Sequence, residues 1–236
     1  MWETSEIKQR GKAAFRMNYW KCVAVSILMS VLTAGVTTVT YNQSTNGQGA
    51  DQQVEQIQNA FNSLTPAQQI AIAAGIAGSL TLIISVSILL DLFVFNPLKV
   101  GCYAFFRENV KEPPADFSHI GVGFGNYVHT FVTLFLKDLF VSLWSLLFLI
   151  PGLIKSYSYR MVPYIITDHP ELSPTETINL SRQMMNGHKW HAFCYDLSFI
   201  GWFILTVLTL GILGVFWTEP YKDSSDAALY LAIKGE

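Results

Sequence analysis

The chain carries little charge for its length. Of its 236 residues, 14% are Asp, Glu, Lys or Arg, whereas a soluble domain carries roughly 25%. Three stretches, residues 22–50, 56–90 and 197–218, contain no charged side chain at all, and each has about 20 residues or more, enough to cross a hydrocarbon core. The sequence therefore predicts an integral membrane protein and excludes a soluble enzyme, a nucleic-acid-binding protein and a secreted disulfide-framed module.

Cysteine is also scarce, and its placement excludes the usual cysteine chemistry. Cys22, Cys102 and Cys194 are far apart and odd in number, so they form neither a C-x-x-C redox pair nor a zinc knuckle. The sequence also lacks the zincin helix motif, the G-x-S-x-G elbow and the Walker signature. We therefore expect no metal, no cofactor and no enzymatic activity.

The N-terminus differs in charge from the polar segment that follows it. Lys8, Lys12 and Arg16 recur at helical spacing before Tyr19 and Trp20, which predicts a basic interfacial helix over residues 1–19 with an aromatic anchor. This helix is a topology signal, or it recruits anionic lipid or a partner. We do not expect a cleaved signal peptide, because the basic region is long and no small-x-small cleavage site follows.

Residues 41–65 are polar and contain no Lys or Arg. Because basic loops stay on the cytoplasmic side, the N-terminus is expected in the cytoplasm and this segment outside the cell membrane.

The apolar segments predict an all-α, polytopic membrane protein with about six hydrophobic helices, forming a single domain over residues 1–236. A second interfacial helix is expected over 174–186. The predicted hydrophobic segments are 20–40, 66–95, 127–150, 153–167, 192–210 and 215–233. The last is a kinked membrane helix or a polar tail, and we favour the helix. Residues expected to break or bend helices are Pro97, Pro151, Gly152, Pro163 and Pro220.

The second hydrophobic segment contains small residues at helical spacing. Small side chains let another helix backbone approach closely, so they favour helix packing over a pore lining. The expected packing residues are Ala71, Ala74, Gly75, Gly78 and Ser79.

Polar side chains within apolar segments are the candidate functional residues, because each is costly at mid-bilayer unless paired or hydrated. The candidates for a polar pocket are Lys155, Tyr159, Arg160, Lys137, Asp138, Asp91 and Asp196. One hypothesis is that the broken helix after Pro151 lines a pocket for an anionic group, as in transporters. The other is that Lys155 and Arg160 pair with the acidic residues and hold the bundle together. Asp91 and Asp196 lie about 7 Å from helix ends and can also reach headgroup water.

Five stretches carry a resemblance to a known family. They are residues 5–20, 150–164, 187–190, 196–202 and 220–221, among them Ile-Pro-Gly-Leu-Ile-Lys-Ser-Tyr-Ser-Tyr-Arg at 150–160. Together they resemble the integral membrane family known as domain of unknown function nine-seven-five, found chiefly in Gram-positive bacteria. The resemblance spans nearly the whole chain and implies five or six spans in a bacterial plasma membrane. It implies no reaction, substrate or catalytic residue.

The expected function is that of a non-catalytic membrane scaffold or accessory subunit. Its partners would be the lipid bilayer, other membrane proteins or a second copy of itself, and no nucleic acid. The alternative is a small transporter or channel-like protein that uses the polar pocket. A transporter should enclose a polar cavity that reaches mid-membrane, whereas a scaffold's charges should be paired or lie at the interface.

Overall fold

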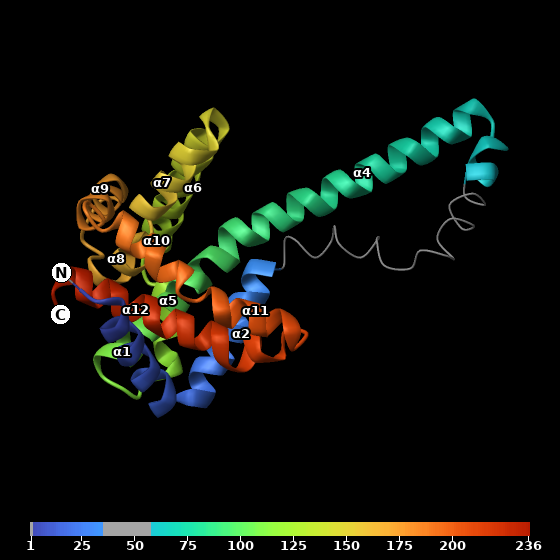
Figure 1. The fold of residues 1–236 in the computed structure, drawn as a ribbon. Helices are drawn as coiled ribbons and strands as arrows, with labels where there is room; N and C mark the ends of the chain where they lie inside the picture. Colours follow the sequence, from blue (N-terminus) through green and yellow to red (C-terminus); the bar gives the residue numbers. More distant parts are fainter. Residues whose placement is uncertain (1, 35–57) are drawn as a thin grey trace. The chain divides into compact units, whose positions relative to one another are not determined.

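The computed structural model describes residues 2–34 and 58–236, whose regular elements are helices, with no strand among them (Figure 1). The elements in chain order are α1 (Thr4–Met17), α2 (Tyr19–Ala34), α4 (Pro66–Leu90), the π-helix η1 (Asp91–Phe95), α5 (Asn96–Lys111), the 3-10 helix η2 (Phe117–Phe124), α6 (Tyr127–Leu147), α7 (Leu149–Ser158), α8 (Val162–Asp168), α9 (Pro174–Met184), α10 (Lys189–Leu197), α11 (Ile200–Leu208), the π-helix η3 (Gly214–Thr218) and α12 (Glu219–Lys234).

The contacts divide the chain into two units. The first comprises Met1–Val31 and Phe93–Glu236, and the second comprises Leu32–Leu92. The expectation of one membrane domain over the whole chain stays a prediction.

Helix α12 forms the centre of the first unit, with α1 and α5 packed against it (Figure 1). Its residues from Ala227 to Leu231 are almost completely buried. The buried side of α1 consists of Ile7, Gly11, Ala14 and Phe15, which recur at the spacing of one helix face. The apolar face of the predicted interfacial helix is therefore covered by protein.

Within the part of the chain that the structure describes, three helices are long and apolar enough to cross a membrane, so the prediction of about six spans is not supported. The candidate spans in the described residues are Pro66–Ser87, Tyr127–Leu147 and Lys189–Leu208. The predicted segment 153–167 is divided between α7, with 10 residues, and α8, with 7, and neither is long enough to span. The apolar helix Tyr19–Thr33 is also short, and the rest of its predicted segment lies outside the described residues.

The predicted sixth span, 215–233, is neither a candidate span nor a free tail. It forms η3 and α12, and α12 has charged residues on one face. Glu219, Asp223 and Asp226 recur at i, i+4 and i+7, so their carboxylates lie on the same side of the helix. Inside the protein, Glu219 and Asp223 accept hydrogen bonds from serines of α2, and Asp226 forms ion pairs.

The prolines expected to break helices lie in first turns. Pro97, Pro163 and Pro220 occupy the second position of α5, α8 and α12, and α5 and α12 follow directly on the π-helical turns η1 and η3. The bend expected at Pro97 is preceded by the π-helical turn η1. The break expected at Pro151 occurs at Phe148, whose φ of −157° and ψ of 143° are extended.

Gly152 brings α6 and α7 into close contact. A Cβ at this position would lie 2.3 Å from Ser145 Oγ and 2.7 Å from Ser145 Cα, so only glycine fits without a shift.

In the second unit, α4 has exposed side chains along most of its length. The predicted packing residues Ala71, Ala74, Gly75, Gly78 and Ser79 all belong to it and are exposed. A Cβ at Gly75 or Gly78 would meet no atom within 4 Å. Of the predicted outer segment 41–65, residues 58–62 are helical and residues 41–57 lie outside the described residues.

The close contact between α1 and α12 predicts that one methyl group added at Gly11 lowers the stability of the fold. A Cβ at Gly11 would lie 2.5 Å from Ser225 Cα, which is backbone and cannot rotate away. We expect Gly11→Ala to lower stability by about 1–3 kcal/mol, the range for overpacking. Gly201→Ala is the matched control, because a Cβ there meets nothing within 4 Å. Thermal unfolding in detergent measures both, and equal melting temperatures would contradict the packing of α1 on α12.

Candidate functional site

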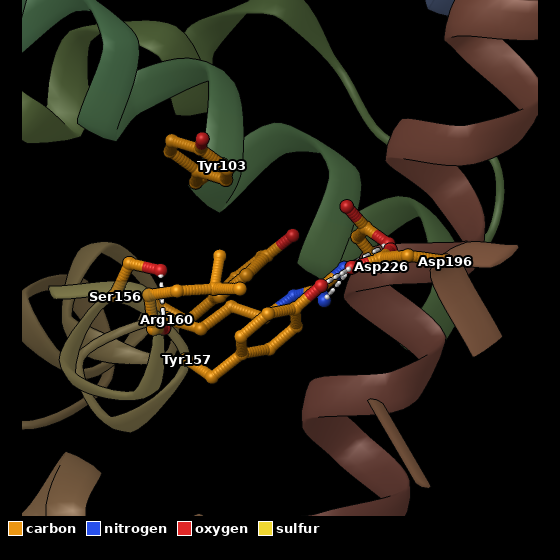
Figure 2. A pocket seen from close by; sticks show the side chains of 8 residues that line it. Tyr103, Ser156, Tyr157, Arg160, Asp196 and Asp226 are labelled. Carbon is orange, nitrogen blue, oxygen red and sulfur yellow. Dashed lines mark hydrogen bonds and ion pairs between the residues drawn. The ribbon is translucent and has the colours of Figure 1, made fainter. Parts of the chain in front are cut away.

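Four charged side chains meet in the first unit, and we call them the four-charge cluster: Arg160, Asp196, Lys222 and Asp226. Arg160 donates from Nη1 to Asp196 Oδ2 at 2.7 Å and from Nη2 to Asp196 Oδ1 at 3.0 Å, a bidentate pair. Its Nη2 also donates to Asp226 Oδ1 at 2.9 Å (Figure 2). Lys222 Nζ lies 3.0 Å from carboxylate oxygens of both aspartates. Two cations thus face two carboxylates, and the cluster is neutral.

Two tyrosines complete the hydrogen bonding of the cluster. Tyr157 donates its hydroxyl to Asp196 Oδ2 at 2.9 Å, and Tyr195 donates to Asp226 Oδ1 at 2.8 Å. The guanidinium carbon of Arg160 also lies 5.8 Å and 5.6 Å from the centres of these two rings, within cation–π range. The part-buried charges are therefore both paired and hydrogen-bonded.

The cluster joins three segments that are separate in the sequence. Arg160 lies in the break between α7 and α8, Asp196 lies in α10, and Lys222 and Asp226 are one turn apart in α12. The break follows from the sequence, because Pro163 has no N–H to donate to the carbonyl four residues earlier. The bent chain turns Arg160 toward α10 and α12.

An open pocket of about 360 Å³ lies against the cluster. It is lined by Tyr103, Leu153, Ser156, Tyr157, Arg160, Tyr164, Asp196 and Asp226. Figure 2 shows Tyr103 on α5, across from Arg160 and Tyr157. The Ser156 hydroxyl is engaged at 2.8 Å with the Leu153 carbonyl of its own helix. The charged groups in the pocket wall are the paired ones described above.

A second set of charged side chains, centred on Asp168, links α5, α8 and the end of α12. Asp168 lies 3.3 Å from Arg107 and 2.9 Å from Lys234, and it accepts a hydrogen bond of 2.5 Å from the Tyr230 hydroxyl. Burial alone would raise the pKa of Asp168, but the hydrogen bonds from Tyr230 and Lys234 and the charge of Arg107 outweigh it and lower the pKa below its ordinary value.

Helix α2 is linked to the acidic face of α12 through two serines. Ser26 donates to Asp223 Oδ2 at 2.6 Å, and Ser30 donates to Glu219. Burial raises the pKa of Asp223 to about 7, although the Ser26 hydrogen bond acts in the opposite direction. In the described part of the chain, no three His, Cys, Asp or Glu side chains gather closely enough to hold a metal ion.

Of the seven residues predicted for a polar pocket, Arg160 and Asp196 are brought together. Lys155 lies apart from them, with its ammonium 4.7 Å from the Trp144 ring centre. Tyr159 is 5% exposed and packs against Phe140 in a separate apolar cluster. Lys155 and Arg160 are only five positions apart in the sequence, yet they contact different parts of the fold.

The other predicted residues do not line this pocket. Lys137 and Asp138 pair with each other at 3.0 Å, and the Asp138 side chain is 56% exposed. Asp91 begins η1 and belongs to the second unit.

The sequence analysis missed Lys222 and Asp226 as members of the cluster, because both fall in a segment interpreted as a membrane helix. The signals in the sequence are the i, i+4, i+7 spacing of the acidic residues of α12, which includes Asp226, and the i, i+4 spacing of Lys222 and Asp226.

The residues of this cluster all fall in the part of the chain that matches a known family. Residues 146–236 match the family described as Protein of unknown function (DUF975). The match confirms the resemblance indicated by the sequence and covers the C-terminal part of the chain, which we call the DUF975 region. No curated protein and no solved structure matches the chain. All four charges of the cluster belong to the DUF975 region, whereas Tyr103 of the pocket wall lies outside it.

Removing Arg160 is expected to destabilise the fold strongly. Arg160→Gln leaves two part-buried carboxylates with one cation, and loss of one partner from such a pair costs about 3–5 kcal/mol. Lys137→Gln is the matched control, because its pair is local and partly exposed and should contribute at most about 1 kcal/mol. Thermal unfolding in detergent measures both. In the double variant Arg160→Gln with Asp226→Asn, charge balance is regained, and we expect part of the lost stability to return. A melting temperature of Arg160→Gln equal to that of the control would refute the role of the cluster.

Asp223 is expected to make stability fall as pH rises. Its pKa of about 7 in the fold lies above the unfolded value of about 3.9, so its contribution is fully present below pH 4 and is lost as pH rises to about 7. The slope for one proton is at most about 1.4 kcal/mol per pH unit. Asp223→Asn should remove this slope, and at pH 8 the variant should be more stable than the unchanged protein. Melting temperatures of both proteins from pH 5 to 8 measure this. Parallel profiles for the two proteins would contradict the assignment.

Proposed function

We propose that this protein is a non-catalytic scaffold or accessory subunit of the cell membrane. The observation that carries the proposal is the complete pairing of the four-charge cluster. Arg160 and Lys222 each contact both Asp196 and Asp226. Charges arranged in this way hold helices together and leave none unbalanced for a substrate. The DUF975 match adds no reaction, which is consistent with a role through binding.

The surface proposed for partner binding is the small-residue face of α4. This helix contains no charged residue, and it is one of the three candidate spans. With no hydrophobic drive between helices in lipid, association depends on close packing, which small residues permit. The partner is another membrane protein or a second copy of this chain.

We infer that the N-terminus lies in the cytoplasm. Residues 1–19 contain Lys8, Arg10, Lys12 and Arg16, whereas residues 41–65 contain no basic side chain. This asymmetry supports the orientation, because basic segments stay on the cytoplasmic side.

One observation favours the alternative of a small transporter or channel-like protein. The open pocket of about 360 Å³ is lined by Ser156, Tyr157 and Arg160, which belong to the broken helix after Pro151. For such a protein to carry a substrate across the bilayer, the pocket would have to open to each side in turn. That movement would break the pairs between Arg160 and α10 or α12.

Photo-crosslinking in intact membranes tests the scaffold proposal. A photoreactive amino acid at Gly78 should give a defined protein adduct, because it lies on the small-residue face. The same amino acid at Leu80, about 160° away around the helix by the spacing of 100° per residue, should react with lipid only.

A second substitution in the same helix shows whether the adduct depends on close packing. Gly75→Ile should abolish the adduct at position 78 by filling the small-residue face. Ile84→Leu is the conservative control, because Ile84 lies about 180° from Gly75 around the helix, and it should leave the adduct unchanged. Lipid adducts alone at both labelled positions would overturn the proposal.

A further inference from the structure

A second polar pocket, of about 420 Å³, differs from the first in its charge. It is lined by Lys155, Ser158, Asn179, Arg182, Gln183, Asn186 and Lys189, and we call it the cationic pocket. Three side chains in its wall are basic and none is acidic. The remaining four carry hydroxyl or amide groups, which can donate hydrogen bonds.

The three cations have no carboxylate partner among the ion pairs of the described residues. Lys155 lies over the Trp144 ring, and Arg182 donates to the Asn179 side-chain oxygen at 3.2 Å. Burial lowers the pKa of Lys155, and the charges of Arg182 and Lys189 lower that pKa further. The three like charges therefore repel each other, and an anion between them would remove that repulsion. The four-charge cluster is neutral by itself, so the cationic pocket is a place where the fold leaves positive charge to be balanced.

An apolar groove of about 450 Å³ adjoins the cationic pocket. It is lined by Ile150, Leu153, Ile154, Tyr157, Lys189, Trp190 and Phe193. Lys189 belongs to both linings, so the groove and the pocket border the same side chain. Ile150 is 72% exposed and Trp190 is 68% exposed, and both would gain from contact with hydrocarbon.

The groove lies between α7 and α10, which contact each other directly. The Tyr157 ring of α7 lies 6.2 Å from the Phe193 ring of α10, measured between ring centres, and the Tyr157 hydroxyl donates to Asp196. Lys189 is the cationic residue of the groove lining.

The position of Lys189 in the chain matches the level of a bilayer surface. Lys189 is the first residue of the candidate span Lys189–Leu208, where lipid headgroups are expected, and Trp190 is of the type enriched at that boundary. Phe193 lies about 6 Å further along the helix axis, toward the acyl chains.

We propose that the cationic pocket and the adjoining groove bind one anionic phospholipid, with its phosphate between Lys155, Arg182 and Lys189 and an acyl chain along Leu153, Ile154 and Phe193. Arg182 and the amides of Asn179 and Asn186 donate to the phosphate oxygens. A zwitterionic lipid fits less well, because its own ammonium group would meet the three cations. This site is independent of the small-residue face of α4.

Native mass spectrometry of the purified full chain in nonionic detergent tests the site. We expect one molecule of dioleoylphosphatidylglycerol to be retained at least about tenfold more tightly than dioleoylphosphatidylcholine. The double variant Arg182→Gln with Lys189→Gln should weaken that binding roughly thirtyfold, from about fivefold for each lost cation. Ile154→Ser should weaken it as well, because it makes the groove polar.

The control has the same change in charge elsewhere in the first unit. Lys12→Gln with Arg16→Gln should leave phosphatidylglycerol binding within about twofold. Loss of binding in this control, with binding kept in the pocket variant, would place the lipid on the N-terminal helix and overturn the proposal. Equal binding of the two phospholipids would also overturn it.

A soluble headgroup separates a lipid site from a small-anion site. Glycerol 3-phosphate has the phosphate but no acyl chain, so it should bind far more weakly than phosphatidylglycerol. Equal affinity would show that free phosphate compounds are the ligand and would overturn the lipid assignment. If the double variant does not fold, the single variant Arg182→Gln replaces it, because Arg182 is exposed. An unchanged affinity of this single variant for phosphatidylglycerol would overturn the proposal.

Discussion

The first unit depends on partners for the charged side chains of α12. This helix lies at the centre with its residues from Ala227 to Leu231 buried, yet it also carries Glu219, Lys222, Asp223 and Asp226. A helix with these charges can occupy a core only if each charge finds a partner. Arg160, Asp196 and the serines of α2 provide those partners, and they come from three other segments. The charges therefore link α12 to α2, to α10 and to the segment between α7 and α8.

The same requirement distinguishes the two polar pockets of the DUF975 region. At the four-charge cluster, two cations and two carboxylates balance within the chain, and tyrosine hydroxyls add further hydrogen bonds. At the cationic pocket, Lys155, Arg182 and Lys189 meet no carboxylate in the pocket wall. Balanced charge is typical of a structural contact, whereas unbalanced charge of one sign indicates a place for a ligand of the other. The break between α7 and α8 separates the two, because it turns Lys155 and Arg160 to different neighbours.

The sequence predicted the class of this fold and much of its local structure. Low charge and long apolar runs predicted helices able to cross a membrane, and three were found. The spacing of Ser173 and Glu176 is that of a capping box, and the structure has both of its hydrogen bonds. The prediction failed where local pattern and packing disagree. The apolar residues of α12 suggested that lipid surrounds this helix. In the structure, α12 is instead in contact with α1, α2 and α5. The alternative to the pocket hypothesis paired Lys155 and Arg160 with Asp91, Asp138 or Asp196. It did not include Lys222 and Asp226.

By itself, the sequence determined that most of this chain is helical, where prolines begin new helices and which stretches are apolar enough for lipid. These properties follow from side chains within a few residues of each other, through hydrogen bonding, ring geometry and hydrophobic run length. Only the tertiary structure decided which charges meet. Arg160, Asp196 and Asp226 are separated by 36 and 30 positions in the chain, and their interaction depends on distances in space. Whether a charge is balanced or left for a ligand therefore follows from the packing of α7, α10 and α12.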